Sequence, residues 1–349
     1  MPSNDQITLK LLGWYKVHKR DLPWRRTRDP YQIWLSEILL QQTRVAQGLP
    51  YFERFVKQYP NVEHLAKASI EEVLKLWQGL GYYSRAHNLH DTARYVAFNL
   101  DGNFPASYDT LLTLKGIGAY TAAAISSICF DEKRAVVDGN VYRVLSRLYG
   151  IETPINQPSA YRIFENISLD LMDDHPPGTY NQALMEFGAV VCTPNNPDCT
   201  VCPISDSCYV FKNSAQKLYP KKLPGKAKKT RFLNYVVIKG HKRIRLYKRG
   251  LDDIWKGMYE PLLVEGSKLF EAEEMLQYLS ELLPVSRLTQ FPDIKHLLTH
   301  RTLHIRFFSV EIDEPISGSE DLWVNTSELA FFALPKPISD FFDRCGNKI

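Results

Sequence analysis

The sequence predicts a mostly helical N-terminal domain followed by a smaller α+β domain. The chain has 349 residues, which exceeds the usual size of one domain. Up to about Phe211, apolar residues recur at spacings of three and four, whereas beyond Arg231 they fall in short alternating or β-branched runs. We expect domains at residues 1–215 and 231–349, joined by a linker at 216–230.

The individual elements follow from these patterns. Helical periodicity is clearest at 33–45, 73–80, 111–128 and 141–148. The strand-like runs are FLNYVVI (232–238), IRLYKR (244–249), TLHIRFFSVEI (302–312) and LWV (322–324), with one helical stretch at 269–283.

The composition is that of a soluble globular protein, with 44% hydrophobic and 23% charged residues. No apolar run approaches the ~20 residues of a membrane span, and the N-terminus lacks the apolar core of a secretory signal. We therefore expect an intracellular protein of a bacterial cytoplasm or nucleoid, with no membrane partner. The net charge of +4 permits a polyanionic partner without requiring one.

The stretch from Lys212 to Arg231 contains eight basic residues and no acidic one, together with two prolines and a glycine. This composition is typical of a linker. It could be a solvated flexible tether or a strap that contacts phosphates.

Four of the six cysteines crowd into a C-x6-C-x2-C-x5-C arrangement. Disulfides are disfavoured in a reducing cytosol, so the clustering indicates a metal. Four thiolates suit zinc or an iron–sulfur cluster, but zinc ribbons usually have two C-x2-C knuckles and this sequence has one, which favours [4Fe–4S]. The expected ligands are Cys192, Cys199, Cys202 and Cys208. Cys129 and Cys345 stand alone and are expected to be ordinary thiols.

The segment LLTLKGIGAYTAAAIS (111–126) predicts a helix that ends at Lys115, a tight turn at Gly116 and Gly118, and a second helix from about Ala119. Such a turn directs unpaired amides at the start of the second helix outward, where they can bind a phosphate. A simple helix C-cap is the alternative for Gly116.

Twenty residues after Gly118, Asp138 precedes an apolar helical pattern and is expected to cap that helix. Such a carboxylate is held ionised by the helix dipole and by amide hydrogen bonds, as is needed to face a developing cation. A cap without chemical function is the alternative.

Glu37 has Ile33, Trp34, Leu40 and Gln41 as its helical neighbours, a largely apolar environment. Desolvation there would raise the pKa of Glu37 and leave it protonated near neutrality. The alternative is a glutamate on the solvated edge of the helix. A protonated acid and an ionised Asp138 are the two groups that glycosidic cleavage requires.

The K-G-x-G hairpin, the V-D-x-N aspartate and the four-cysteine loop together resemble the helix-hairpin-helix DNA glycosylases of the endonuclease III superfamily. The resemblance covers about Trp24 to Cys208. It implies an all-helical, two-lobed fold with DNA in the cleft. Members that also cut the strand carry a lysine two residues after the second glycine, where this chain has Tyr120. A phenol cannot form an imine, so a monofunctional glycosylase is expected, although Tyr120 could instead be a packing residue.

The segments LPWRR (22–26), WLSEILLQQT (34–43) and GLGYYSRA (79–86) are similar to those of the MutY family of adenine DNA glycosylases. The resemblance implies an enzyme that acts on double-stranded DNA with adenine opposite 8-oxoguanine or guanine. We expect it to be a monomer, although the sequence itself does not give the oligomeric state. By the same resemblance, Glu37 would protonate adenine and Asp138 would stabilise or capture the sugar cation. Tyr120 would support that intermediate, and Asn140 would help to position water.

Further sites follow from the same resemblance. Gln42 and Tyr82 would fill or wedge the position that adenine leaves, a step that costs a few kcal/mol. The base pocket would be lined by Arg20, Trp24 and Arg25. For Trp24 and Tyr82, a place among ordinary core aromatics is the alternative.

The C-terminal domain, with DIWKGMYEPL (253–262), resembles the MutT-like domain of the same family. The hydrolase signature of MutT enzymes is absent after Glu260, so no pyrophosphatase activity is expected. The segment KHLLTHRTLHIR (295–306) aligns with a hairpin that contacts 8-oxoguanine through a phenylalanine, a serine and a histidine. Here these are Leu298, Thr299 and His300, so the aromatic ring is lost. A polar hairpin is the alternative.

Two other functions compete with this prediction. An endonuclease III-like pyrimidine glycosylase with lyase action is disfavoured by Tyr120 and by the second domain. A DNA-binding or damage-scanning protein without catalysis is disfavoured because Glu37 and Asp138 both stand in their motifs.

Overall fold

The computed structural model of the protein describes residues 3–225, 227–241, 243–285, 287–312 and 322–345. The chain forms two compact units: residues 1–67 and 88–225 make up the first, and residues 68–87 and 226–349 make up the second. The expected division at 216–230 stays a prediction. No helix in the described ranges is long and apolar enough to cross a membrane.

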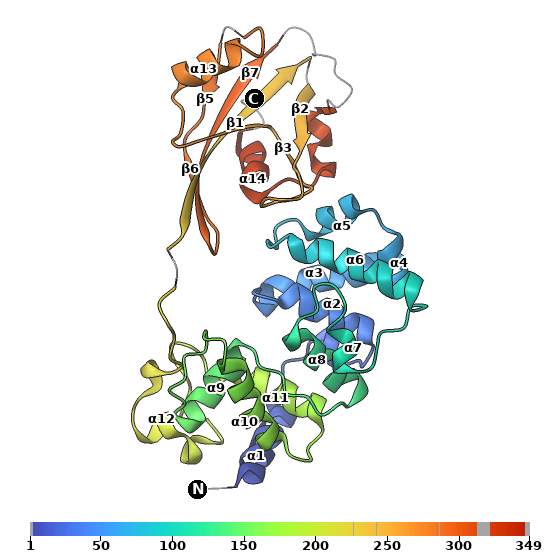
Figure 1. Ribbon diagram of the computed structural model, residues 1–349, viewed down its shortest axis with the longest axis vertical. Coiled ribbons are helices and arrows are strands. Elements are labelled where there is room, and N and C mark those ends of the chain that lie inside the picture. Colours follow the sequence, from blue (N-terminus) through green and yellow to red (C-terminus); the bar gives the residue numbers. More distant parts are fainter. Residues whose placement is uncertain (1–2, 226, 242, 286, 313–321, 346–349) are drawn as a thin grey trace. The chain divides into compact units, whose positions relative to one another are not determined.

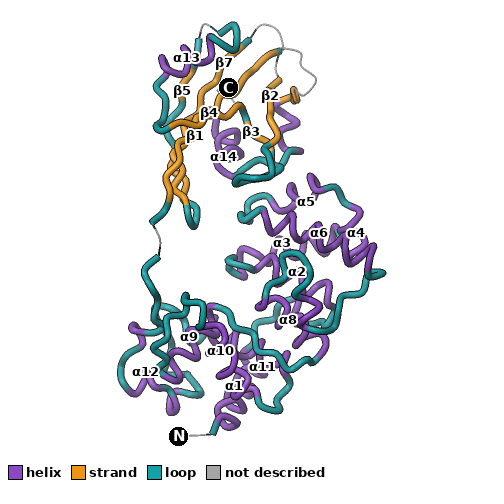
Figure 2. Tube along the Cα trace, viewed as in Figure 1, coloured by secondary structure: helices purple, strands orange, loops and turns teal. Residues whose placement is uncertain are grey.

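The first unit is helical, as Figure 2 shows. Its helices are α1 (Asn4–His18), η1 (Pro23–Arg25), α2 (Pro30–Leu40), α3 (Val45–Gln58), α4 (Val62–Lys67), α6 (Ser84–Asn99, which starts in the second unit), α7 (Tyr108–Leu111), α8 (Ala119–Phe130), α9 (Gly139–Tyr149), α10 (Ala160–Met172), α11 (Pro177–Val190), η2 (Ser205–Ser207), α12 (Tyr209–Lys212) and η3 (Gln216–Leu218).

Local sequence signals set where several of these helices begin. Ser3 and Gln6 form a capping box at the start of α1, and Asp29 caps α2 immediately before Pro30. Both arrangements satisfy amides that a helix leaves unpaired at its N-terminus. The Asp29 cap fixes the start of α2, the helix that carries Glu37.

Helix α11 is the central element of the first unit, because it packs against α1, α8 and α9. Its fully buried Tyr180 and Phe187 join Phe164 of α10 in one hydrophobic core. Partly buried Cys192, Cys202 and Cys208 pack against the same core. The core therefore supports both the four-cysteine loop and the start of α9, whose Val141 belongs to it.

The second unit contains a mixed sheet flanked by helices (Figure 1). Its elements are α5 (Ile70–Trp77), β1 (Lys229–Gly240), β2 (Arg243–Lys248), β3 (Tyr259–Glu260), β4 (Leu262–Gly266), α13 (Ala272–Ser280), β5 (Thr289–Gln290), β6 (Ile294–Leu297), β7 (Arg301–Glu311), β8 (Leu322–Asn325), η4 (Thr326–Phe331) and α14 (Lys336–Cys345).

Strands β1 and β7 form the centre of this sheet and run parallel, from Lys229 opposite Arg301 to Lys239 opposite Glu311. The other ladders are antiparallel: β2 and β4 pair with β1, β5 and β6 pair with β7, and β3 and β8 pair with β2. Adjacent side chains of a strand point to opposite faces. Accordingly, Phe308 packs toward α13, whereas the ring of Phe307 stacks on Phe341 of α14 at 3.9 Å.

The strands predicted at 232–238, 244–249, 302–312 and 322–324 and the helix predicted at 269–283 occur with boundaries shifted by a few residues. Strands β3, β4, β5 and β6 and helix α14 were not predicted. Two details of the helical prediction were wrong. The stretch 33–45 is not one helix, because α2 ends at Leu40 and α3 begins at Val45. The segment before the hairpin is the four-residue helix α7 followed by turns, and regular helix does not reach Lys115.

Candidate active site

Glu37 lies on α2 with only 8% of its surface exposed. Trp34, one turn earlier, is fully buried, so the apolar environment expected from the sequence is present. Burial raises the pKa of Glu37 to about 7, opposed by a hydrogen bond from Tyr120. At neutral pH a large fraction of this carboxyl therefore keeps its proton, and the solvated-edge alternative is wrong.

Tyr120, in the first turn of α8, points its hydroxyl at Glu37. Its O–H donates to Oε2 of Glu37 at 2.5 Å and lies 3.7 Å from Sδ of Met185 on α11. Burial raises the pKa of the phenol well above its ordinary value, so the hydroxyl stays protonated and remains a donor. The two residues come together because α2 packs against α8.

Asp138 is the N-cap of α9, as the sequence predicted. Its Oδ1 accepts hydrogen bonds from the amides of Asn140 at 2.8 Å and Val141 at 2.7 Å, and its Oδ2 accepts from Nδ2 of Asn140 at 2.7 Å. Burial raises the pKa of Asp138 above its ordinary value even though these hydrogen bonds lower it. The hydrogen bonds of the cap therefore limit the rise in the pKa of Asp138 that desolvation causes. This rise was not expected from the sequence.

Arg143, which sequence reasoning missed, fixes the orientation of Asn140. Its Nη2 donates to Oδ1 of Asn140 at 2.8 Å and to the carbonyl of Gly188 at 2.7 Å, and its Nε donates to the carbonyl of Cys192 at 2.7 Å. One buried guanidinium thus connects the start of α9 with the four-cysteine loop. Its signal in the sequence was a charge beside the apolar positions Val141 and Val144.

Arg20 and Arg25, expected in the base pocket, converge on a residue that was not predicted. Both donate to Glu186 of α11, at distances between 2.6 and 2.7 Å for the side-chain contacts. Trp24 is 6% exposed and packs edge-on against Phe52. The ring is thus part of the core, and its role in the base pocket stays a prediction.

Gln42 and Tyr82, the two expected wedge residues, share an unusual backbone conformation. Their φ angles are 55° and 50°, in the left-handed region that costs a non-glycine residue roughly 1–2 kcal/mol. Both side chains are exposed, and Tyr82 has 41% of its surface accessible. Strain of this kind is concentrated at functional loops, which supports a role for both positions.

The hairpin before α8 requires glycine at one of its two positions. Gly116 has φ 76°, and a Cβ there would lie 2.6 Å from Cβ of Asn88. Gly118 is the N-cap of α8 and has no side chain to cap it. The first amides of α8 are thus left for an external acceptor, as a phosphate site requires.

In the second unit, Leu298, Thr299 and His300 form the tip between β6 and β7. The tip is closed by a hydrogen bond from the amide of Leu298 to the carbonyl of Arg301 at 2.9 Å. Thr299 and His300 are exposed, and Leu298 is half-buried. The hydroxyls of Tyr82 and Thr299 are in hydrogen-bonding contact. All four residues line a cavity of about 530 Å³ in this unit, together with Trp255.

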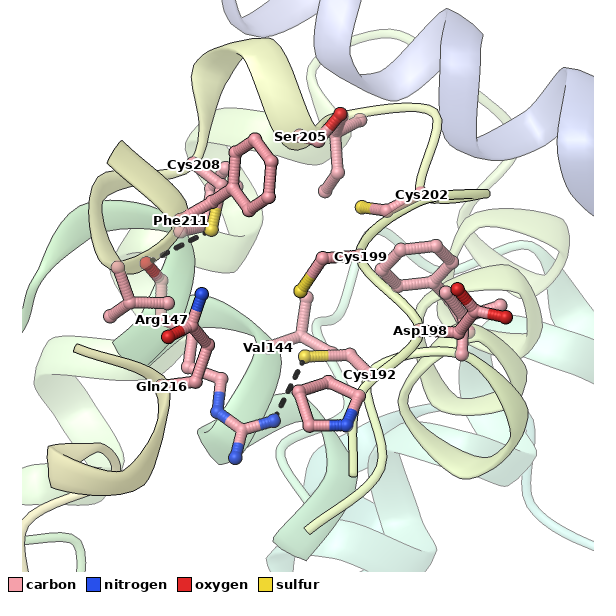
Figure 3. Close-up of a pocket in the computed structure, with 16 residues that line it drawn as sticks. Val144, Arg147, Cys192, Asp198, Cys199, Cys202, Ser205, Cys208, Phe211 and Gln216 are labelled. Atoms are coloured by element: carbon pink, nitrogen blue, oxygen red, sulfur yellow. Dashed lines mark hydrogen bonds between the residues drawn. The ribbon is translucent and has the colours of Figure 1, made fainter. Parts of the chain in front are cut away.

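The four clustered cysteines surround a small apolar cavity of about 30 Å³ (Figure 3). Nη1 of Arg147 donates to Sγ of Cys192 at 3.4 Å, and Sγ of Cys208 donates to the carbonyl of Arg147 at 3.4 Å. Burial raises the pKa of Cys202 to about 12 and also raises the pKa values of Cys199 and Cys208.

No group of metal-ligating side chains within the described ranges has the geometry of a closed metal site. The donor set nevertheless fits a thiolate-bound metal group, since four sulfurs border one cavity and an arginine lies beside Cys192. Burial among apolar residues disfavours the thiolate form, and a bound metal cation stabilises that form by compensating its negative charge.

Comparison with known proteins identifies the class to which this fold and site belong. Residues 35–167 match the HhH-GPD superfamily of base excision DNA repair proteins, and residues 234–344 match the NUDIX domain. The structure of a thermostable thymine-DNA glycosylase is similar at 30% identity and a TM-score of 0.56, over 60% of this chain and 97% of that one. A non-covalent endonuclease III–DNA complex shares the fold, at 22% identity and a TM-score of 0.52, over 62% of this chain and all of that protein. The N-terminal part of the chain is therefore a helix-hairpin-helix glycosylase domain.

Two relatives with similar sequences identify the particular family. The adenine DNA glycosylase of Buchnera aphidicola subsp. Schizaphis graminum is 30% identical over 338 residues, covering 95% of this chain and 96% of that protein. The enzyme of the same name from Mus musculus is 44% identical over 225 residues, 62% of this chain and 44% of the mouse protein. The chain belongs to the adenine DNA glycosylase family, enzymes of base excision repair that act on N-glycosyl bonds.

Proposed function

We propose that this enzyme hydrolyses the N-glycosidic bond of adenine mispaired with 8-oxoguanine or guanine in double-stranded DNA, without cutting the strand. The observation that carries the proposal is the hydrogen bond between Tyr120 and a buried Glu37 with a raised pKa. Beside them, Asp138 caps α9, so two carboxyls with different surroundings are available for the two roles of glycosidic cleavage.

In the first step, Glu37 transfers its proton to adenine at N7. The bond between C1′ and the base then breaks, and its electron pair leaves with the neutral base. The sugar acquires oxocarbenium character. The carboxylate of Asp138 then either stabilises this positive charge or forms a bond with C1′. Tyr120 donates to the carboxylate that Glu37 becomes, which favours its ionised form as the proton leaves.

In the second step, water adds to C1′ and gives a proton to the carboxylate that Glu37 has become, which leaves an abasic site. If Asp138 has captured C1′, the bond between them breaks in this step and Asp138 returns to a free carboxylate. Asn140 is suited to position this water, because Asp138 and Arg143 both hydrogen-bond its side-chain amide. An amide held from both ends has little rotational freedom, so it presents the same polar atoms in each turnover. Strand cleavage by imine formation is not expected, because Tyr120 offers a phenol in place of an amine.

Binding to DNA follows from the exposed loops. The hairpin at Gly116 and Gly118 would bind a backbone phosphate through the first amides of α8. Gln42 and Tyr82 would fill the position that the flipped adenine leaves. Thr299 and His300, with Leu298, would contact 8-oxoguanine from the second unit. We further propose that the enzyme acts as a monomer in the cytoplasm or nucleoid of a bacterial cell.

The four cysteines would hold one [4Fe–4S] cluster, with Cys192, Cys199, Cys202 and Cys208 as ligands. Such a group would supply structural cross-linking of the loop after α11. Arg147 supports this assignment because its guanidinium lies against the sulfur of Cys192. Iron and sulfide analysis of purified protein tests it: four irons per chain would agree, and stoichiometric zinc without iron would contradict it.

The substrate assignment is tested by single-turnover base release from duplexes with adenine opposite 8-oxoguanine, guanine or thymine, and with thymine opposite guanine. We expect release of adenine from the first two only. Glu37→Gln and Asp138→Asn should bind the mispaired duplex and release no base. Native release by Glu37→Gln would refute the acid assignment, and release of thymine would refute the substrate.

A further inference from the structure

Glu186 is a buried carboxylate beside the candidate active site that no part of the proposed mechanism uses. It lies on α11, next to Met185, and has 1% of its surface exposed. It accepts hydrogen bonds from the backbone amide of Arg20 at 3.0 Å, from Nε and Nη2 of Arg20 at 2.7 and 2.6 Å, and from Nη2 of Arg25 at 2.6 Å.

Arg25 is the more buried of the two arginines, with 10% of its side chain exposed against 38% for Arg20. Its other terminal nitrogen donates to the carbonyl of Arg20 at 3.1 Å, and its guanidinium lies over the ring of Tyr15 at 5.7 Å. Because little water screens a buried guanidinium, its positive charge affects groups at a greater distance than an exposed charge would. Glu186 is the carboxylate in direct contact with it.

The charge of Arg25 acts on Glu37. Although burial opposes it, the hydrogen bonds from Arg20 and Arg25 lower the pKa of Glu186 to about 2, so Glu186 is ionised at every physiological pH. Arg25 in turn lowers the pKa of Glu37, against the larger effect of burial. An uncompensated Arg25 would therefore favour loss of the proton that Glu37 must keep until adenine is bound.

We propose that Glu186 is a positioning residue of the active site: it anchors Arg25 and Arg20 beside the base pocket and offsets one of their two positive charges, so that Glu37 retains its proton. This inference rests on the proposed role of Glu37 as the acid. Among the described residues, the titratable groups that interact electrostatically with Glu37 include Tyr120 and Cys129 of α8, Asp138 before α9 and Arg25 of η1. Of these, Arg25 is the cation.

The test is the pH dependence of single-turnover adenine release, measured over roughly pH 5 to 9 for the native enzyme, Glu186→Gln and Glu186→Asp. Release should fall at alkaline pH as Glu37 ionises. In Glu186→Gln, this alkaline limb should move to lower pH by about half a unit to one unit, which means a three- to tenfold loss above the limb and little loss below it. Glu186→Asp keeps the charge and should keep the native limb.

An unmoved limb in Glu186→Gln, even with a lower rate at every pH, would overturn the proposal, because a merely structural role predicts that result. Glu132→Gln is the matched control, since Glu132 also pairs with an arginine, Arg134, in the first unit, and its limb should not move. If Glu186→Gln does not fold, Arg25→Gln carries the same test with the opposite sign, and its limb should move to higher pH.

Glu37→Gln is measured alongside, to separate this inference from the proposed function. If Glu37→Gln releases base, the proposed function fails. If Glu37→Gln is inactive and the limb of Glu186→Gln does not move, only the role of Glu186 is refuted.

Discussion

The hydroxyl of Tyr120 donates a hydrogen bond of 2.5 Å to Oε2 of Glu37, a residue 83 positions earlier in the chain. Glu37 is the acceptor here, so its other oxygen is the one free to carry a proton toward a base. The contact fixes the rotamer of the acid before the substrate arrives, which is the pre-organisation that general acid catalysis needs. It depends on the packing of α2 against α8.

Replacing Glu37 with glutamine should stabilise the protein at alkaline pH. The pKa of Glu37 rises from 4.5 to about 7 on folding, so the folded state holds a proton that the unfolded state has lost. The contribution of this proton to the free energy of unfolding is complete below the unfolded pKa and is lost as the pH rises through about 7. The free energy of unfolding thereby changes by on the order of 3 kcal/mol. Thermal melts should show Glu37→Gln above the native protein at about pH 8.5 and close to it near pH 5. A native protein that is equally stable relative to the variant at both pH values would contradict the raised pKa.

Replacing Gln42 with glycine should separate stability from function. Glycine adopts the left-handed conformation without strain, so the free energy of unfolding should change by no more than about 1 kcal/mol. Adenine release should nevertheless fall roughly tenfold, because the side chain that fills the vacated stack is gone. Asp101→Gly is the matched control, since Asp101 also has a left-handed backbone, with φ 51°. Equal activity of the two variants would exclude Gln42 as a wedge.

Gly188→Ala should impair catalysis from outside the site. A Cβ on Gly188 would lie 2.7 Å from Cβ of Asn140 and 3.1 Å from its backbone, so the first turn of α9 must shift, with Asp138. We expect a loss of stability of about 1–3 kcal/mol and a fall in base release of roughly a hundredfold with retained DNA binding. Gly13→Ala in α1, where a Cβ would meet nothing within 4 Å, should instead stabilise by about 0.5–1 kcal/mol. Native rates in Gly188→Ala would show that the start of α9 tolerates the displacement.

Asp253→Asn should weaken the preference for 8-oxoguanine. Asp253 accepts hydrogen bonds from Arg231 at 2.7 Å, from Arg249 at 2.8 Å and from Arg301 at 2.9 Å. Arg301 directly follows the tip residues, so these bonds hold the base of the tip. The rate ratio between adenine opposite 8-oxoguanine and adenine opposite guanine should fall several-fold, by about 1 kcal/mol.

Asp293→Asn is the control for this effect. Asp293 pairs with Arg306 at 2.6 Å, farther along β7 from the tip, and the substitution should leave the ratio unchanged. A parallel fall in both variants would mean that the sheet is generally loosened and that Asp253 has no specific effect on the tip.

Local signals accounted for much of the fold and part of the site. The apolar periodicity of α9 predicted both the helix and its Asp138 cap, and alternation predicted β1 and β7. The apolar helical neighbours Ile33 and Trp34 predicted the burial of Glu37. These features are encoded within one or two helical turns or a few strand residues, so a single sequence reveals them.

What the sequence could not show depends on packing between distant elements. The break between α2 and α3 at Gln42 interrupts an apolar pattern that continues through it. Glu186 lies in a mostly apolar helix, and only the fold brings Arg20 and Arg25 to it from more than 160 residues away. Arg143 likewise acquires its role from the carbonyls of Gly188 and Cys192. Such contacts have no signature in local spacing.

The central claim, hydrolysis of adenine's glycosidic bond without strand cleavage, is tested most directly by one measurement. An end-labelled duplex with adenine opposite 8-oxoguanine is incubated with excess enzyme, and each sample is resolved with and without hot alkali. We predict cleavage at the adenine position only after alkali, because Tyr120 provides no amine for an imine. Cleavage without alkali would contradict the account by revealing lyase activity, and intact strands in both lanes despite DNA binding would contradict it by removing the catalysis altogether.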